Sequence, residues 1–381
     1  MTYQQISTTK RVLFFDQIRA LMIALVIAVH VFPLAFTSGW FGVRIPTAVS
    51  TDAFFDVAGG FFLYFCNSFF MCMLFLLSGY FVPRSVHKKG IEHYLKDRLR
   101  RIGIPFLVGL LLINNASWLL GGLSPSSPLA ELPSSEIPFN SIMALWFLVV
   151  LFVFDLLYCA WIALRGDRFS VDTSVSAPQL RSWLISAIVL AILEVVMVKQ
   201  SHLWIALARS PLNGLGAQGM HIFTYAFMFF LGCKASFHCW LERLNTHLVV
   251  RWFRFSVALV LCLLAISLVL TFNGSMSSEY AKLSLLGAFL NPFIGWGIIA
   301  YLLLWFQRNE HRCGQWLASA GGDSFGAYVI HPLVLVIVLT TIGFIGFNHW
   351  LIALAASALG IMISFAISHQ LRRIPSVARI I

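Results

Sequence analysis

Long apolar segments separated by short polar ones run along almost the whole chain. A helix of about 20 mostly apolar residues is long enough to cross the hydrocarbon core of a bilayer. The pattern predicts ten membrane-spanning helices, over residues 12–36, 54–82, 102–122, 142–164, 182–200, 218–236, 251–272, 281–306, 324–346 and 350–371. The predicted fold class is therefore all-α, a polytopic integral membrane protein with a single domain over residues 1–381.

The composition strengthens this assignment. Hydrophobic residues make up 59% of the chain and charged residues 11%, which excludes an ordinary soluble domain. The first apolar segment is too long for a cleavable signal peptide and contains charged residues. None of the seven cysteines forms a CxxC pair, so we interpret them as buried small residues and predict no metal site.

The net charge of the chain is +11, and its Lys and Arg residues are spread unevenly between the two sides of the predicted membrane. With the N-terminus inside, nearly all Lys and Arg residues fall in the cytoplasmic segments. The outer side then holds only Arg44, Lys199, Arg209 and Lys282, and Arg19 lies in the first span. This asymmetry follows the positive-inside rule, and it predicts both termini in the cytoplasm of a bacterial inner membrane. Membrane lipids, and not nucleic acid, are the expected partners of this basic charge.

Three ionisable residues in the first span call for an explanation, because such groups are costly inside a membrane. At about 100° per residue, Asp16, Arg19 and His30 share one stripe of the helix, with His30 about 16 Å along the axis from Arg19. An acid, a base and a titratable imidazole therefore face the same way at different depths. Such a stripe suits acid–base catalysis, and it also suits a proton relay in a carrier.

Two other polar groups in the first half of the chain have competing interpretations. Arg98 and Arg101 are three residues apart on a predicted helix, so a pair of guanidinium groups could bind phosphates. Positive-inside residues touching anionic lipid are the simpler interpretation, and spacing alone favours it. Ser78 and Tyr80 flank Gly79 near the inner end of the second span. Close helix packing is the favoured interpretation of Ser78 and Gly79, and Tyr80 could equally be an interfacial anchor.

Further polar residues lie in later spans. His331 precedes Pro332, so the helix is expected to be disturbed there and a backbone carbonyl to be freed. Asp323 or Ser324 is the expected cap of the ninth span. Asp155 and Glu194 are interpreted as polar packing contacts, and pairing of Glu194 with Lys199 at the membrane interface is the alternative for Glu194. The loops 37–53, 121–141 and 201–217 are expected outside. Loop 121–141 is long enough to help shape an external mouth, and loop 201–217 suits either contact with a polar acceptor or an ordinary amphipathic surface turn.

Several segments coincide in order with those of a known family. They are FFDQIRALMIALVIAVH, FLLSGYF, the R-x-x-R motif that leads into IGIPFL, LWFLVVLFVF and GAYVIHPLVL. Together they resemble the acyltransferase type 3 family of membrane O-acyltransferases, over essentially the whole chain. The IGIPFL and LWFLVVL segments are similar to its glucan-modifying branch, which includes glucan succinyltransferases. Relatives in that branch have a His and an Arg where this chain has Asn67 and Phe70.

The resemblance implies an activity and roles for particular residues. It implies cytoplasmic acyl-CoA, either acetyl-CoA or succinyl-CoA, as co-substrate, with no tightly bound cofactor and an envelope polysaccharide or glucan as acceptor. The motifs that match are Arg19 with His30, Ser78-Gly79-Tyr80, Arg98 with Arg101, and Tyr328 with His331-Pro332.

In this interpretation His30, with Asp16 and Arg19, forms the catalytic group. His30 acts as the general base or carries the acyl group itself. Arg19, Arg98 and Arg101 lie where CoA phosphates would arrive, and Ser78 and Tyr80 are assigned to the donor site. Tyr328 and His331 donate hydrogen bonds to the thioester oxygen or the leaving thiolate. The alternative function is a proton-coupled transporter or flippase that uses the polar stripe of the first span.

Overall fold

The computed structural model describes residues 13–33, 41, 43, 53–123, 139–166, 169–208, 210, 212–343 and 348–380. In this part of the chain there is no strand, and ten helical runs are long and apolar enough to cross a membrane, which confirms the predicted fold class. The long helices are α1 (Leu13–Pro33), α2 (Ala53–Asn67), α3 (Phe70–Lys89), α7 (Trp146–Arg165), α8 (Leu180–Lys199), α11 (Ile222–His238), α12 (Thr246–Phe272), α13 (Met276–Asn309), α14 (Gly314–Gly343) and α15 (His349–Leu371). The shorter ones are α4 (Ile91–Arg98), α5 (Ile104–Val108), α6 (Asn115–Gly121), α9 (Ser201–Ala208), α10 (Asn213–Gln218) and α16 (Pro375–Ala378).

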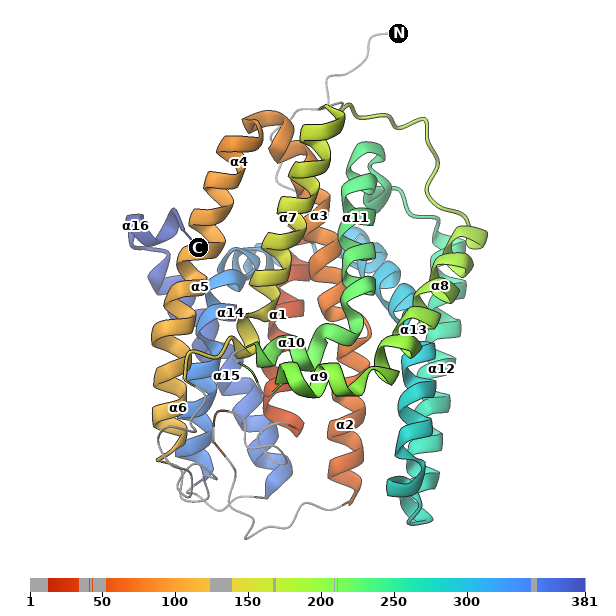
Figure 1. Ribbon diagram of the computed structural model, residues 1–381, viewed down its shortest axis with the longest axis vertical. Helices are drawn as coiled ribbons and strands as arrows, with labels where there is room; N and C mark the ends of the chain where they lie inside the picture. Colours follow the sequence, from red (N-terminus) through yellow and green to blue (C-terminus); the bar gives the residue numbers. More distant parts are fainter. Residues whose placement is uncertain are drawn as a thin grey trace.

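Helix α1, with its polar stripe, lies in the middle of the bundle (Figure 1). It packs mainly against α14 and α15, and also against α2, α3 and α13. On the other side, α13 packs against α12 and α8. Most side chains of α1 are buried inside the protein, so its ionisable groups face neighbouring helices.

The first turn of α1 is anchored to the connection between α13 and α14. The Glu310 carboxylate accepts a hydrogen bond from the backbone N–H of Leu13 (2.9 Å). The Gln17 side-chain amide donates to the carbonyls of Glu310 (2.8 Å) and Gly314 (3.2 Å). Because the first N–H groups of a helix have no partner within it, these contacts fix the start and the rotation of α1.

Helices α3 and α11 cross at backbone contact. A Cβ atom on Gly79 would lie 2.0 Å from the carbonyl oxygen of Phe229, and one on Gly232 would lie 2.2 Å from that of Leu76. Small residues at a crossing let two membrane helices approach until their backbones touch. The glycine of the S-G-Y motif is therefore explained by packing, as its position in an apolar helix suggested.

The second predicted span, 54–82, is divided into two helices and is longer than expected. The Ser68 hydroxyl donates to the carbonyl of Phe65 (2.7 Å), and the helix is interrupted at Ser68 and Phe69. A serine that bonds a carbonyl of its own turn competes with regular helical bonding. Helix α3 then continues to Lys89, beyond the predicted end.

The third and ninth spans begin earlier than predicted. The basic helix α4 continues as a helix into α5 and α6 through two π-helical segments, Leu99–Gly103 and Gly109–Asn114. Helix α14 begins at Gly314, so Asp323 lies inside the helix and does not cap it. The prediction of a cap at Asp323 or Ser324 is therefore wrong, and the actual role of Asp323 is described below.

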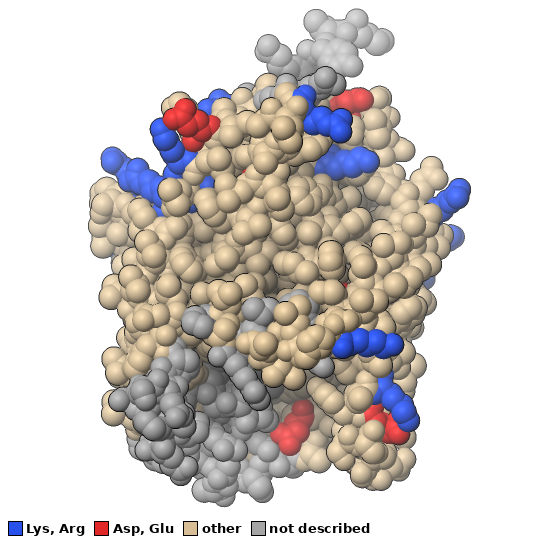
Figure 2. Space-filling model, viewed as in Figure 1, with Lys and Arg blue, Asp and Glu red and all other residues tan. Residues whose placement is uncertain are grey.

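The predicted outer loop 201–217 is largely helical. It contains α9 and α10, which run across the bundle beside the ends of α8 and α11 (Figure 1). Most of the predicted loops 37–53 and 121–141 lies outside the described residues. The space-filling view shows a broad band without charged side chains, with most Lys and Arg toward the end of the molecule near α4 (Figure 2). This distribution is typical of a protein surrounded by lipid.

Candidate active site

The structure brings His30 and His331 together inside the bundle. Their ring centroids are 5.0 Å apart, although one residue lies on α1 and the other on α14. His331 is fully buried, and the His30 side chain is largely shielded. Two imidazoles from helices far apart in sequence therefore share one place in the interior.

Both imidazoles are held by carbonyl groups of their own helices. The Nδ1 atom of His30 lies 2.6 Å from the carbonyl oxygen of Val26, and that of His331 lies 2.5 Å from the carbonyl oxygen of Tyr328. A carbonyl oxygen only accepts, so Nδ1 carries the proton in each ring. In the neutral imidazoles Nε2 then bears the lone pair, which is the arrangement required of a base.

Pro332 explains why the Tyr328 carbonyl can hold His331. In a regular helix this carbonyl would accept from the N–H of residue 332, but proline has none. Helix α14 continues through Pro332, and the imidazole of the preceding residue takes the vacant position. The freed carbonyl that the sequence predicts is therefore present and is used by His331.

Tyr328 connects this histidine pair to the segment before α7. Its hydroxyl donates to the carbonyl of Ala144, which lies in the 3₁₀ turn Met143–Leu145. The backbone N–H of Met143 in turn donates to Asn213 of α10 (3.0 Å). Met143 has φ of +38°, which is strained for a residue other than glycine. A short path of hydrogen bonds and backbone thus links α10 to the His331 imidazole.

Asp16 and Arg19 form an ion pair toward the start of α1. Nη1 of Arg19 lies 2.9 Å from Oδ1 of Asp16, and the guanidinium stacks over Phe81 with its Cζ 4.9 Å from the ring centroid. Asp16 is buried, whereas about a third of the Arg19 side chain (34%) is exposed. The buried Asp16 carboxylate therefore holds the partly exposed Arg19 guanidinium in place within the first two turns of α1.

Ser78 and Tyr80 lie on α3, where Ser78 is half-buried and Tyr80 is fully buried. The Tyr80 hydroxyl donates to Glu242 (2.5 Å) and accepts from Arg84 (3.2 Å). Glu242 belongs to the turn that follows α11. Tyr80 links the middle of α3 to the turn after α11, and its assignment to a donor site stays a prediction.

Arg98 and Arg101 occupy different surroundings. Nε of Arg98 lies 3.1 Å from the buried Asp155 carboxylate and donates to the hydroxyl of Tyr94 (2.8 Å), which itself donates to Asp155 (2.7 Å). Arg101 is exposed. The π-helical segment between them widens the turn, so the shared face expected from regular spacing is not formed. Asp155 is the polar contact that the sequence suggested, with a partner that it did not indicate.

Two buried carboxylates have partners that sequence reasoning missed. Glu194 accepts hydrogen bonds from Thr224 (2.6 Å) and Asn291 (2.8 Å) and lies 3.1 Å from Nδ1 of His221. The alternative pairing of Glu194 with Lys199 is wrong, because the carboxylate points into the bundle. The only sign of this cluster in the sequence is that Glu194 is a lone carboxylate in an apolar segment.

Asp323 is the second such carboxylate. It forms an ion pair with Arg372 (2.7 Å) and contacts His369 (3.1 Å) at the end of α15. Ser368 also donates to the Asp323 carbonyl (2.7 Å). These contacts hold α14 and α15 together near the end of the bundle where α1 begins.

Comparison with known proteins identifies the family. Residues 12–369 match the acyltransferase-3 family, described as an acyltransferase domain. Among curated proteins, the chain is similar to glucans biosynthesis protein C of Escherichia coli strain K12 and of Shigella boydii serotype 4. Each match is 28% identical over 162 residues, which is 41% of this chain and 40% of the relative. Because the family match spans nearly all of the sequence, this multi-pass membrane protein belongs to the acyltransferase-3 family.

Proposed function

We propose that this protein transfers an acyl group, acetyl or succinyl, from cytoplasmic acyl-CoA to a hydroxyl group of an envelope glycan. Membership of an acyltransferase family supports the reaction class. The name of the similar glucans biosynthesis proteins favours a glucan as acceptor. The basic cytoplasmic segments favour a bacterial inner membrane location with both termini in the cytoplasm.

The observation that carries the proposal is the pair of imidazoles that meet inside the bundle, each with Nδ1 bonded to a carbonyl of its own helix. Nε2 of His30 takes the proton of the acceptor hydroxyl as its oxygen attacks the thioester carbonyl carbon. The C–S bond breaks, and the CoA thiolate receives the proton from the imidazolium. His331, 5.0 Å away, shares the proton during this exchange. Because the Tyr328 hydroxyl already donates to Ala144, we assign Tyr328 to positioning His331 and not to donor binding.

The donor is proposed to enter from the side of Arg19 and Arg101. Arg19 stacks on Phe81 and remains partly exposed, and Arg101 is exposed, so both cations are accessible to CoA phosphates. Arg98 is engaged by Asp155 and contributes by fixing the basic helix that carries Arg101. Asp16 orients Arg19 through their ion pair.

The test uses the purified full-length protein in lipid nanodiscs with acetyl-CoA or succinyl-CoA and a glucan oligosaccharide. Release of the CoA thiol and a glycan mass increased by one acyl group are expected only when donor and acceptor are both present. An acyl adduct located on His30 by peptide mass spectrometry, with donor alone, would instead assign the covalent role to this residue. No thiol release and no CoA binding would contradict the proposal and favour a carrier.

A further inference from the structure

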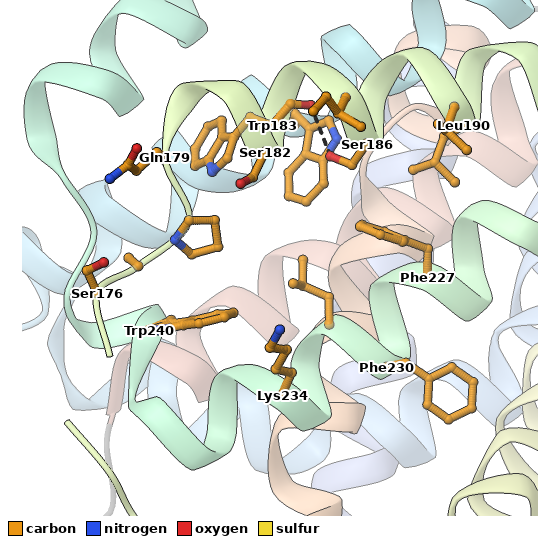
Figure 3. A pocket seen from close by; sticks show the side chains of 16 residues that line it. Ser176, Gln179, Ser182, Trp183, Ser186, Leu190, Phe227, Phe230, Lys234 and Trp240 are labelled. Carbon is orange, nitrogen blue, oxygen red and sulfur yellow. Dashed lines mark hydrogen bonds between the residues drawn. The ribbon is translucent and has the colours of Figure 1, made fainter. Parts of the chain in front are cut away.

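A pocket of about 980 Å³ lies between α8, α11 and α13, and none of the residues that line it belongs to the candidate active site. Figure 3 shows aromatic and aliphatic side chains around it, with Trp183, Phe227 and Trp240 among them. The rings of Trp183 and Trp296 stack with centroids 5.6 Å apart, and Phe227 meets Trp296 edge-on at 5.8 Å. These contacts form a firm apolar wall.

Polar groups occupy defined positions in this pocket. Among the described residues that line the pocket, Lys234 is the one cation, and its ammonium lies 5.6 Å from the ring centroid of Trp240. Ser182 and Gln179 add a hydroxyl and an amide. The Trp296 side chain is 7% exposed, and within the described residues its Nε1 has no hydrogen-bond acceptor. A cation with a hydroxyl and an amide nearby, in an otherwise apolar pocket, favours a ligand that has both an apolar part and an anionic, oxygen-rich group.

The pocket is continuous with the lipid-facing surface of the bundle. Ile185, Val189 and Phe230 line it, and they are exposed by 51%, 50% and 38%. Lys234 lies near the end of α11, in the segment that the charge distribution assigns to the cytoplasmic side. The Lys234 ammonium is therefore expected at the level of the lipid headgroups, and Phe227 and Leu190 of the apolar wall deeper in the membrane. Lys side chains near helix ends commonly reach the membrane interface in this way.

We propose that this pocket binds one membrane phospholipid with an anionic headgroup. The lipid phosphate contacts Lys234 and the Ser182 hydroxyl, and an acyl chain lies along Phe227, Leu190 and Val189. One cation matches the single negative charge of phosphatidylglycerol, whereas CoA carries several negative charges and approaches from water. Binding of this lipid is independent of acyl transfer, so it does not rest on the proposed function.

Native mass spectrometry of the full-length protein in neutral detergent tests the assignment. Dioleoyl phosphatidylglycerol and dioleoyl phosphatidylcholine are added separately, and the bound lipids are counted. One phosphatidylglycerol is expected to bind at concentrations where phosphatidylcholine does not. Lys234→Ala should weaken this binding about tenfold, because a charge-assisted contact is lost. Ser182→Trp should block it by filling the pocket from an exposed position.

Two control variants match these changes. Lys88→Ala removes an exposed cation from α3, and Leu184→Trp adds an indole to an exposed position of α8 that does not line the pocket. Both should bind phosphatidylglycerol like the unchanged protein. Equal binding of the two lipids, or full binding by Lys234→Ala, would overturn the proposal. Displacement of the lipid by CoA would also overturn it and assign the pocket to the donor.

Discussion

At the scale of single residues, His30 and His331 are distinguished from other histidines by how their rings are held. Each Nδ1 is bonded to a carbonyl of its own helix, so a substitution of His30 removes the base, its ring contact with His331 and a hydrogen bond within α1. We expect His30→Ala to lower the rate of acyl transfer by about 10²–10⁴-fold. Donor binding and the melting temperature should change little. The assay is CoA thiol release at saturating acyl-CoA.

His93→Ala is the matched control for this experiment, because His93 is exposed on the basic helix α4. It should retain full activity. Near-normal acyl transfer by a well-folded His30→Ala protein would rule out both the base and the covalent role of His30.

Arg98 and Arg101 should respond differently to substitution by alanine. Removing Arg98 leaves the buried Asp155 carboxylate without its ion-pair partner, which costs about 3–5 kcal/mol in the free energy of unfolding. Arg101→Ala should leave stability unchanged and weaken CoA binding, increasingly so with added salt. Thermal unfolding and calorimetric titration with CoA measure the two effects.

Arg100→Ala, another exposed arginine on the same segment, controls for the loss of a surface charge. If Arg101→Ala and Arg100→Ala both bind CoA like the unchanged protein, Arg101 has no specific role in CoA binding. The basic segment would then serve only to set the membrane topology and to contact anionic lipid. A stable Arg98→Ala protein would show that the Asp155 pair does not support the fold.

At the scale of helices, the crossing of α3 and α11 leaves no room for a side chain at Gly79. Because a Cβ atom there would lie 2.0 Å from a backbone oxygen, Gly79→Ala must separate the two helices. We expect a loss of about 1–3 kcal/mol in stability, measured by thermal unfolding in detergent. Gly60→Ala on α2 is the control, since a Cβ atom at Gly60 meets nothing within 4 Å. Equal stability of both variants would contradict this account of the S-G-Y glycine.

The sequence predicts helices well because each span has its own hydrophobic pattern. It also places Asp16 and Arg19 on one stripe of the first helix, because residues three apart lie nearly one turn apart, and the structure shows that they form an ion pair. It misses features set by the local path of the backbone. The π-helical turn between Arg98 and Arg101 rotates the two side chains apart, and no spacing rule anticipates it.

Partners that come from distant segments are also beyond a single-sequence reading. The Glu194 carboxylate is bonded to side chains 30 and 97 residues away, and apolar periodicity does not indicate which helices will meet. The family resemblance implies that His30 and His331 act on the same thioester, but their direct contact is known only from the structure.

At the scale of the whole molecule, the proposed reaction requires access from both sides of the membrane. In a chain freed of its seven cysteines, we expect Glu92→Cys to react only with reagent on the cytoplasmic side. Lys282→Cys should react only from outside. Both side chains are exposed, by 74% and 78%, so protection cannot be explained by burial. The reverse labelling would invert the assigned topology and remove the route from cytoplasmic acyl-CoA.

The carbonyl contacts of the two imidazoles have a consequence for the rate of the reaction. Since Val26 and Tyr328 orient these rings before any substrate is present, the entropy cost of positioning them is met when the bundle folds. No reorganisation of the bases is then needed at the moment of proton transfer. The slow event in each cycle should therefore be the meeting of two substrates that arrive from opposite aqueous compartments.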